Sequence, residues 1–152
     1  MQLAQPQIER SATRSLVEFR LVPPPLVDQV FRAAPDAEEW LEEALARVGD
    51  FELCDLMPDL RTGQMQLWIG YRGSRVDVAV LTQIQNRPRK KVGILFALGG
   101  LNRKLWLHHL ATIEAWMKTE GCERIDAFAR PGLAQELPDY IKSHLWMTKA
   151  LQ

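Results

Sequence analysis

Two adjacent glycines followed by two basic residues form the segment of this sequence with the clearest chemical potential. Gly99 and Gly100 end a strongly apolar run, and Arg103 and Lys104 stand where the next helix is expected to begin. The N–H groups in the first turn of a helix have no partner within the helix and carry partial positive charge, so they bind phosphate groups well. This spacing is compatible with a phosphate site, but a pair of glycines after a strand also forms a plain turn.

The other reactive side chains do not follow a known catalytic pattern. His108 and His109 are neighbours on one expected helix and therefore point about 100° apart, whereas a zinc-binding helix needs two histidines four residues apart. Cys54 and Cys122 have no paired spacing, and no serine lies in a Gly-x-Ser-x-Gly elbow. We therefore expect no metal site, no disulfide framework and no hydrolase chemistry.

A basic cluster and a surplus of tryptophans indicate a protein-binding role. The cluster occupies one expected hairpin turn, with Arg72 and Arg75 on the neighbouring turn, and consists of Arg87, Arg89, Lys90 and Lys91. It suits phosphates or an acidic protein surface, and a solvated hairpin tip explains it equally well. Because 19 basic residues balance 19 acidic ones and no aromatic residue interrupts the cluster, a protein partner is favoured over nucleic acid. Trp68, expected on the outer face of its strand, is a candidate for the same interface.

Composition predicts one folded domain. The 152 residues are 47% hydrophobic and 25% charged, which is ordinary for a globular protein. We expect a flexible amino-terminal arm over residues 1–14 and a single domain over residues 15–152. The arm is too polar for a secretory signal, and the strongest apolar run, residues 92–98, is far shorter than a membrane span.

Hydrophobic periodicity predicts an α/β (α+β) fold with a central, mixed, mostly antiparallel twisted sheet flanked by helices. Asp36 is expected to cap a helix that ends at Gly49, and the pair Gly99 and Gly100 to break the central strand. We expect strands over residues 15–22, 64–84 (a hairpin), 92–98, 124–130 and 144–151, and helices over residues 26–31, 36–48, 55–61, 103–120 and 131–138.

The order of the expected elements and the local sequence of two segments resemble a known superfamily. The first stretch joins Gly63-Gln64-Met65-Gln66-Leu67-Trp68 to residues 84–92, and the second comprises residues 113–116, 121–122, 130–132 and 137–140. Over residues 21–151 the chain resembles the GNAT (acetyltransferase-like) superfamily, in the form that tailed bacteriophages encode. The resemblance implies a GNAT-like fold with a potential acyl-CoA site.

The resemblance places the cofactor pyrophosphate on the loop of Gly99, Gly100, Arg103 and Lys104. The family pattern reads Arg or Gln, two residues, Gly, one residue, then Gly or Ala. This sequence departs from the pattern because its two glycines are adjacent and neither Arg nor Gln stands three residues ahead of them. The departure puts acetyl-CoA binding in doubt.

The resemblance also implies acid–base residues that this sequence largely lacks. The strand over residues 92–98 contains no carboxylate to act as general base. Glu114 and Asp126 are expected to be solvated or salt-bridged. Tyr140 corresponds to the proton donor for the thiolate leaving group and is the remaining catalytic candidate.

Two hypotheses follow from these observations. The first is a catalytically degenerate GNAT-fold protein that binds no cofactor and acts as a structural or interaction component of a tailed-bacteriophage virion. It would be made in the host cytoplasm and would contact other virion proteins, with no membrane involved. The alternative is an acetyl-CoA-dependent N-acetyltransferase with an atypical pyrophosphate loop.

Overall fold

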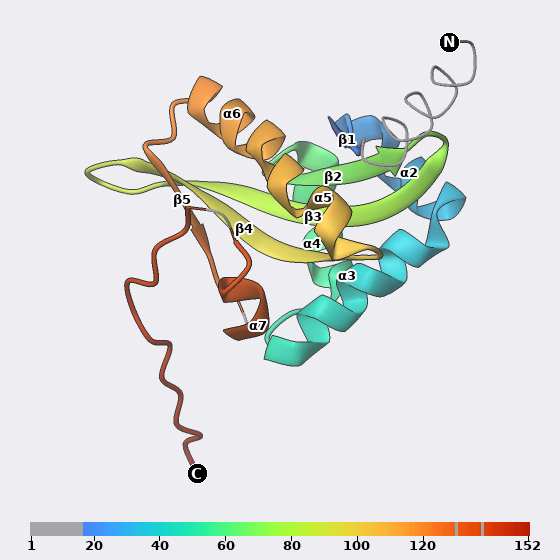
Figure 1. The fold of residues 1–152 in the computed structure, drawn as a ribbon. Helices are drawn as coiled ribbons and strands as arrows, with labels where there is room; N and C mark the ends of the chain where they lie inside the picture. Colours follow the sequence, from blue (N-terminus) through green and yellow to red (C-terminus); the bar gives the residue numbers. More distant parts are fainter. Residues whose placement is uncertain (1–16, 130, 138) are drawn as a thin grey trace.

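A five-stranded sheet organises the chain (Figure 1), and the computed structural model describes residues 17–129, 131–137 and 139–152. The strands lie side by side in chain order: β1 (Glu18–Leu21), β2 (Met65–Arg72), β3 (Arg75–Asn86), β4 (Lys91–Gly100) and β5 (Arg124–Ala127). Only the β4–β5 pair is parallel; the other three pairs are antiparallel. The predicted mixed, mostly antiparallel sheet is confirmed. The expected arm, residues 1–14, lies outside the described residues.

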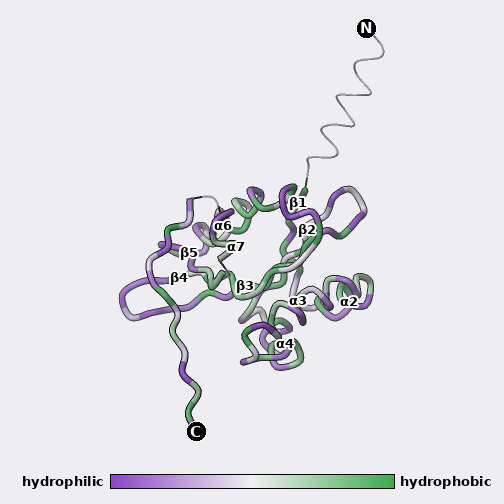
Figure 2. The backbone as a smooth tube through the Cα atoms, turned by 60° about the horizontal axis from the view of Figure 1, so that its bottom comes forward, coloured by the Kyte–Doolittle hydropathy of each residue, from purple (hydrophilic) through white to green (hydrophobic). Residues whose placement is uncertain are grey.

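Helices cover both faces of the sheet (Figures 1 and 2). One face carries η1 (Pro24–Leu26), α2 (Val27–Ala33), α3 (Pro35–Val48) and α4 (Leu53–Thr62). The other carries α5 (Arg103–Trp106), η2 (Leu107–Leu110) and α6 (Ala111–Thr119), and α7 (Pro131–Ala134) follows β5. Among the described residues, none of these helices has the length and apolar character to cross a bilayer.

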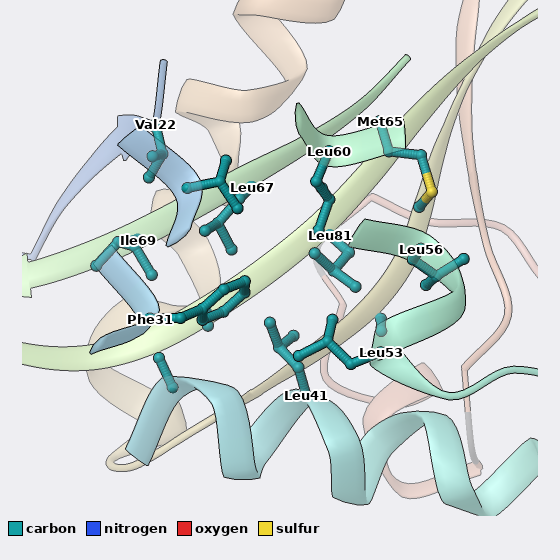
Figure 3. Close-up of a cluster of buried hydrophobic side chains, with 14 of the residues drawn as sticks. Val22, Phe31, Leu41, Leu53, Leu56, Leu60, Met65, Leu67, Ile69 and Leu81 are labelled. Carbon is teal, nitrogen blue, oxygen red and sulfur yellow. The ribbon is translucent and has the colours of Figure 1, made fainter. Parts of the chain in front are cut away.

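The first core lies between the sheet and helices α2, α3 and α4 (Figure 3). Alternate residues of β2 and β3 point into it, including Leu67, Ile69 and Leu81, which are at most 1% exposed. Phe31 and Leu41 meet them from α2 and α3. The period-two pattern of the strands and the helical spacing of the apolar residues therefore serve one shared interior.

The second core lies under α6 and contains Trp68. This side chain is 3% exposed, its ring meets Trp116 edge to face at 5.4 Å, and its Nε1–H donates to Thr82 Oγ1 at 3.0 Å. The prediction that Trp68 contributes to a protein interface is wrong, because α6 covers the strand face that was expected to be outward. A strand covered by helices on both faces has no outer face.

Two β-bulges bend the sheet. Between Gly70 and Tyr71 of β2 the pairing on β3 skips Asp77, and between Leu81 and Thr82 of β3 the pairing on β4 skips Phe96. Each bulge leaves one extra residue outside the ladder and increases the local twist. The bulge at Phe96 falls where β4 and β5 part, so it shapes the region described below.

Several predicted element boundaries are wrong. Gly99 and Gly100 do not break the central strand, because both remain paired with β3. Asp36 lies in the first turn of α3; the cap position is Ala34, since Pro35 has a fixed φ that suits the first helical residue. The strand expected over residues 124–130 is shorter and ends at Ala127.

Two further predictions fail in the carboxyl-terminal third. The long helix over residues 103–120 is interrupted at Trp106, whose φ of −119° departs from helical geometry and whose indole N–H donates to the Leu101 carbonyl at 2.7 Å. Residues 144–151 form no strand, because residues 141–152 have no ladder partner in the described chain. A strand needs a neighbour to satisfy its backbone groups, however suitable its sequence.

Candidate functional site

The candidate site is the place where β4 and β5 separate. Their parallel pairing runs from Val92 and Arg124 to Leu95 and Ala127 and stops there, one residue before the bulge at Phe96. Beyond it, β4 continues to Gly100 with β3 as its partner. The loop at residues 101–102 and the start of α5 lie at the far end of this length of β4, which has no pairing with β5.

Gly99 and Gly100 lie in this length of β4, where close packing explains both of them. A Cβ atom on Gly99 would stand 2.9 Å from the carbonyl oxygen of Trp40 on α3. A Cβ atom on Gly100 would overlap the carbonyl oxygen of Asp77 and stand 2.7 Å from the Cα atom of Val78 on β3. The absence of side chains therefore lets a helix and a neighbouring strand approach β4.

The Leu101 amide and the Arg103 side chain of the next loop have partners within the protein. The Leu101 N–H donates to the Asp77 carbonyl at 2.8 Å, and Asn102 has a left-handed φ of 54°. The guanidinium of Arg103 holds both carboxylate oxygens of Glu136, at 3.0 Å from Nη2 and 2.6 Å from Nε. Lys104 is exposed.

These groups do not fit a pyrophosphate as they stand. To receive one, Arg103 would have to release Glu136, and the Leu101 amide would have to release Asp77. The α5 helix that follows has only four residues, so its aligned peptide dipoles are few. The structure brings Gly99, Gly100, Arg103 and Lys104 to one end of β4, where the Arg103 guanidinium is paired with Glu136 and Lys104 is exposed.

Asp77 is a buried charged residue that the sequence analysis missed. It is the extra residue of the β3 bulge and is 0% exposed. Its Oδ2 lies 2.8 Å from Nε of Arg72 and its Oδ1 lies 3.2 Å from Nε of Arg75. These are close ion pairs without the alignment of hydrogen bonds. The signal in the sequence is a single acid at the start of an apolar strand, with an arginine on each side of the turn at Gly73.

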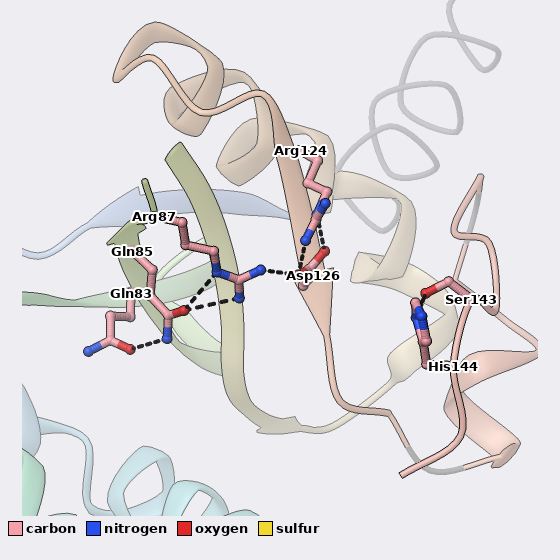
Figure 4. A network of polar contacts seen from close by, with 7 residues as sticks. All are labelled: Gln83, Gln85, Arg87, Arg124, Asp126, Ser143 and His144. Carbon is pink, nitrogen blue, oxygen red and sulfur yellow. Dashed lines mark hydrogen bonds and ion pairs between the residues drawn. The ribbon is translucent and has the colours of Figure 1, made fainter. Parts of the chain in front are cut away.

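The basic hairpin of Arg87, Arg89, Lys90 and Lys91 is only partly free to meet a partner. Figure 4 shows Arg87 reaching from the hairpin to Asp126 on β5, where the two groups lie 3.7 Å apart. Asp126 is also paired with Arg124 at 2.9 Å, so the expectation that Asp126 is salt-bridged is confirmed. The Nζ of Lys91 donates to the Glu120 carbonyl at 2.6 Å. Arg89 and Lys90 remain exposed at the tip.

Tyr140 forms a hydrogen bond with α6. Its hydroxyl donates to Oε2 of Glu114 at 2.8 Å. Burial raises the pKa of Tyr140 well above its usual value, and the adjacent carboxylate raises it further. A tyrosine with a raised pKa is a weaker proton donor, so the environment of Tyr140 favours an anchoring contact over acid catalysis.

Replacing Tyr140 with Phe should cost about 1.5–3 kcal/mol of stability at neutral pH, since one hydrogen bond to a charged group is lost. The folded pKa lies above the unfolded value of 10.0, so this contribution is complete below pH 10 and declines as the pH rises beyond it. The difference between wild type and Y140F in urea unfolding should therefore shrink above pH 10. A difference that grows with pH would contradict the assignment.

Comparisons with known proteins agree on the fold. No family model matches the sequence, and no curated protein matches it. An aminoglycoside acetyltransferase from an uncultured soil metagenomic sample, solved with sisomicin, is similar with a TM-score of 0.63 and 9% identity over 90% of this chain and 97% of its own. A GCN5-related N-acetyltransferase from Ralstonia eutropha JMP134 is similar with a TM-score of 0.63 and 16% identity over 90% and 99%.

A GNAT family acetyltransferase from Staphylococcus aureus is similar to the same degree, with a TM-score of 0.63 and 14% identity over 89% of this chain and 98% of its own. These identities are too low to transfer an activity, but the coverage includes nearly all of each structure. The five-stranded sheet and the helices that flank it are included in the match. The chain therefore has the fold of the GNAT acetyltransferases.

Proposed function

We propose that this chain uses the GNAT fold as a binding scaffold and does not carry out acyl-CoA-dependent chemistry. The observation that carries the proposal is the loop after β4. Its arginine is held by Glu136, its Leu101 amide donates to Asp77, and its glycines accommodate α3 and β3. In addition, β4 contains no Asp or Glu that could take a proton from an amine.

Calorimetric titration with acetyl-CoA tests this proposal. We expect no heat of binding and no change in Tm at millimolar ligand, because a phosphate contact from Arg103 or from the Leu101 amide would first have to break an internal one. The variant Glu136→Gln, which frees Arg103, is the matched comparison. Micromolar binding by the wild-type chain would refute the proposal.

An acetyl-CoA-dependent N-acetyltransferase is the second candidate function. Two observations favour it: β4 and β5 separate at Leu95 and Ala127, and the similar solved structures are acetyltransferases. In this case Gly99, Gly100, Arg103 and Lys104 would hold the cofactor, and Tyr140 would supply the proton. Micromolar binding in the same titration, with transfer of a radiolabelled acetyl group to an amine, would establish it.

A tailed-bacteriophage particle is the setting that we propose for the scaffold. The support is the resemblance of residues 63–68, 84–92, 113–116, 121–122, 130–132 and 137–140 to GNAT-like proteins encoded by such phages. The exposed Arg89 and Lys90 at the hairpin tip offer positive charge to an acidic neighbour among the virion proteins. Mass spectrometry of purified particles should find the chain at stoichiometric level, and its absence would remove this setting.

A further inference from the structure

The zero net charge of the chain conceals two parts of opposite charge. Residues 35–60, which cover α3 and most of α4, contain nine Asp and Glu residues and one basic residue, Arg47. Residues 78–113 contain six Lys and Arg residues and no acid. Four of these bases gather at the tip of the β3–β4 hairpin: Arg87, Arg89, Lys90 and Lys91. Separated surfaces of opposite sign attract other molecules even when the total charge is zero.

The hairpin tip projects from the body of the molecule (Figure 1). The Arg87 N–H donates to the Lys90 carbonyl at 3.0 Å and closes the tip, and Pro88 restricts the backbone further. The Arg87 side chain is itself held by Asp126 (Figure 4). Arg89 and Lys90 are exposed and form no ion pair with any residue that the structure describes. The tip therefore presents two cations on a preorganised turn.

An open hollow of about 690 Å³ is lined by side chains of α2, α3 and α4. Its volume lies within the roughly 300–1,000 Å³ that is typical of ligand pockets. Phe31 and Leu53, which are buried, and Met57, which is half-buried, give it an apolar floor. The hollow can therefore receive the side chains of a narrow protruding element such as a hairpin tip.

The charged side chains around this hollow leave an excess of negative charge. Asp28 and Arg61 neutralise each other through two contacts of 2.9 and 3.0 Å. Arg32 is the other cation among the described lining residues, and it is outnumbered by Glu38 and Glu42. These two carboxylates lie one turn apart on α3, are exposed and have no ion pair within the described chain. The same two helices carry further acids: Asp36, Glu39, Glu43, Asp55 and Asp59. The hollow therefore favours a cationic guest.

Arg89 and Lys90 match this hollow in both polarity and charge. Arginine and lysine side chains have an apolar stem that packs on apolar surface and a charged head that stays at a polar rim. The floor suits the stems, and Glu38 and Glu42 suit the heads. The hairpin tip and α2 lie at opposite ends of the molecule in both views (Figures 1 and 2). A chain therefore cannot fill its own hollow with its own tip.

We infer that the hairpin tip of one copy, with Arg89 and Lys90, docks into the hollow between α2, α3 and α4 of a second copy, so that the chain associates head to tail. Both complementary surfaces occur on the same molecule and hence in equal number. A different acidic protein would satisfy the tip and leave the hollow of this chain unfilled. Because tip and hollow are different surfaces, each added copy presents a new tip or a new hollow, and the assembly grows instead of closing as a two-fold dimer.

This inference rests on the proposed scaffold role, in which the hairpin tip serves binding, and it names the acidic neighbour of the tip as another copy of the chain. A single exposed ion pair contributes little to binding, so the association is expected to be weak and sensitive to salt. Its failure would leave the outcome of the acetyl-CoA titration unchanged. The two proposals can therefore fail separately.

Light scattering after size exclusion measures the association. At about 0.1 M salt, where charges act over about 10 Å, the average mass of the wild type should rise between micromolar and millimolar protein. At about 1 M salt, where this distance is about 3 Å, the rise should disappear. The variant R89E/K90E should associate at least about tenfold more weakly, because like charges would meet at the hollow. The control K104E/K118E makes the same charge change on the other face of the sheet and should associate as the wild type does.

A charge exchange separates docking from any other effect of the substitutions. E38K/E42K alone should also lose association, because its basic hollow would repel the basic tip. An equimolar mixture of E38K/E42K and R89E/K90E should recover association, since each tip then meets a hollow of opposite charge on the other variant. The quadruple variant E38K/E42K/R89E/K90E should recover it without a second protein.

Three results would overturn the inference. The first is a wild-type mass that does not change with protein concentration. The second is a charge exchange that fails to recover the association lost in the two double variants. The third is an association of the wild type that nuclease treatment abolishes, which would assign the hairpin tip to nucleic acid.

Discussion

Replacing Arg72 and Arg75 together with Met should lower the free energy of unfolding by about 3–5 kcal/mol, the range observed when a buried ion pair loses one partner. The substitution leaves the Asp77 carboxylate, which is 0% exposed, without its two counter-charges. Water cannot compensate, since the residue lies inside the β3 bulge. Urea unfolding at neutral pH measures the change.

Two further variants separate charge burial from lost packing. Adding Asp77→Asn to R72M/R75M should recover most of the stability, because the buried charge is removed. Arg75→Met alone should cost about 1 kcal/mol or less, since Arg75 is 59% exposed and Arg72 remains in place. If the double variant lies within 1 kcal/mol of wild type, or if Asp77→Asn gives no recovery, the arginines do not neutralise Asp77.

Replacing Gly100 with Ala should destabilise the protein by about 3 kcal/mol or more, at the upper end of the range for overpacking. The added Cβ would overlap the Asp77 carbonyl and approach the Cα atom of Val78, and backbone atoms cannot rotate away. Thermal unfolding and soluble yield measure the effect. The same carbonyl accepts the Leu101 N–H, so the shift should also disturb the loop after β4.

Gly132→Ala is the matched control for this prediction. A Cβ atom on Gly132 meets nothing within 4 Å, and its φ is not in the left-handed region. The change should be within about 0.5 kcal/mol of wild type. A Gly100→Ala variant as stable as Gly132→Ala would mean that the close approach of β3 does not require a glycine.

Alternation and helical spacing predicted most of the fold. The hairpin of β2 and β3, the central position of β4 and the apolar faces of α2 and α3 follow from the period of the pattern, which local geometry fixes. The pattern did not predict the residue at which β4 ends. Two adjacent glycines locally suggest a break, but the ladder that keeps Gly99 and Gly100 in the strand pairs them with Ala79 and Val78, which are far away in the sequence.

The same limit explains what the sequence could not show about the site. The alternation of residues in its strand predicts that Trp68 points outward. Only the position of α6 shows that the side chain is covered. The ion pair of Arg103 with Glu136 joins residues 33 positions apart, so no local sequence pattern predicts it. The strand pattern of residues 144–151 is present in the sequence, but its partner is not in the described chain.

The backbone amides of residues 101–104 give the most direct test of the scaffold account. In a ¹⁵N-labelled sample of the 17.4 kDa chain, their resonances can be followed during titration with coenzyme A. The account predicts no saturable shift of these amides up to millimolar ligand, because the Asp77 carbonyl occupies the Leu101 amide and Glu136 occupies the Arg103 guanidinium. Shifts of Leu101 to Lys104 that saturate at micromolar coenzyme A would contradict it.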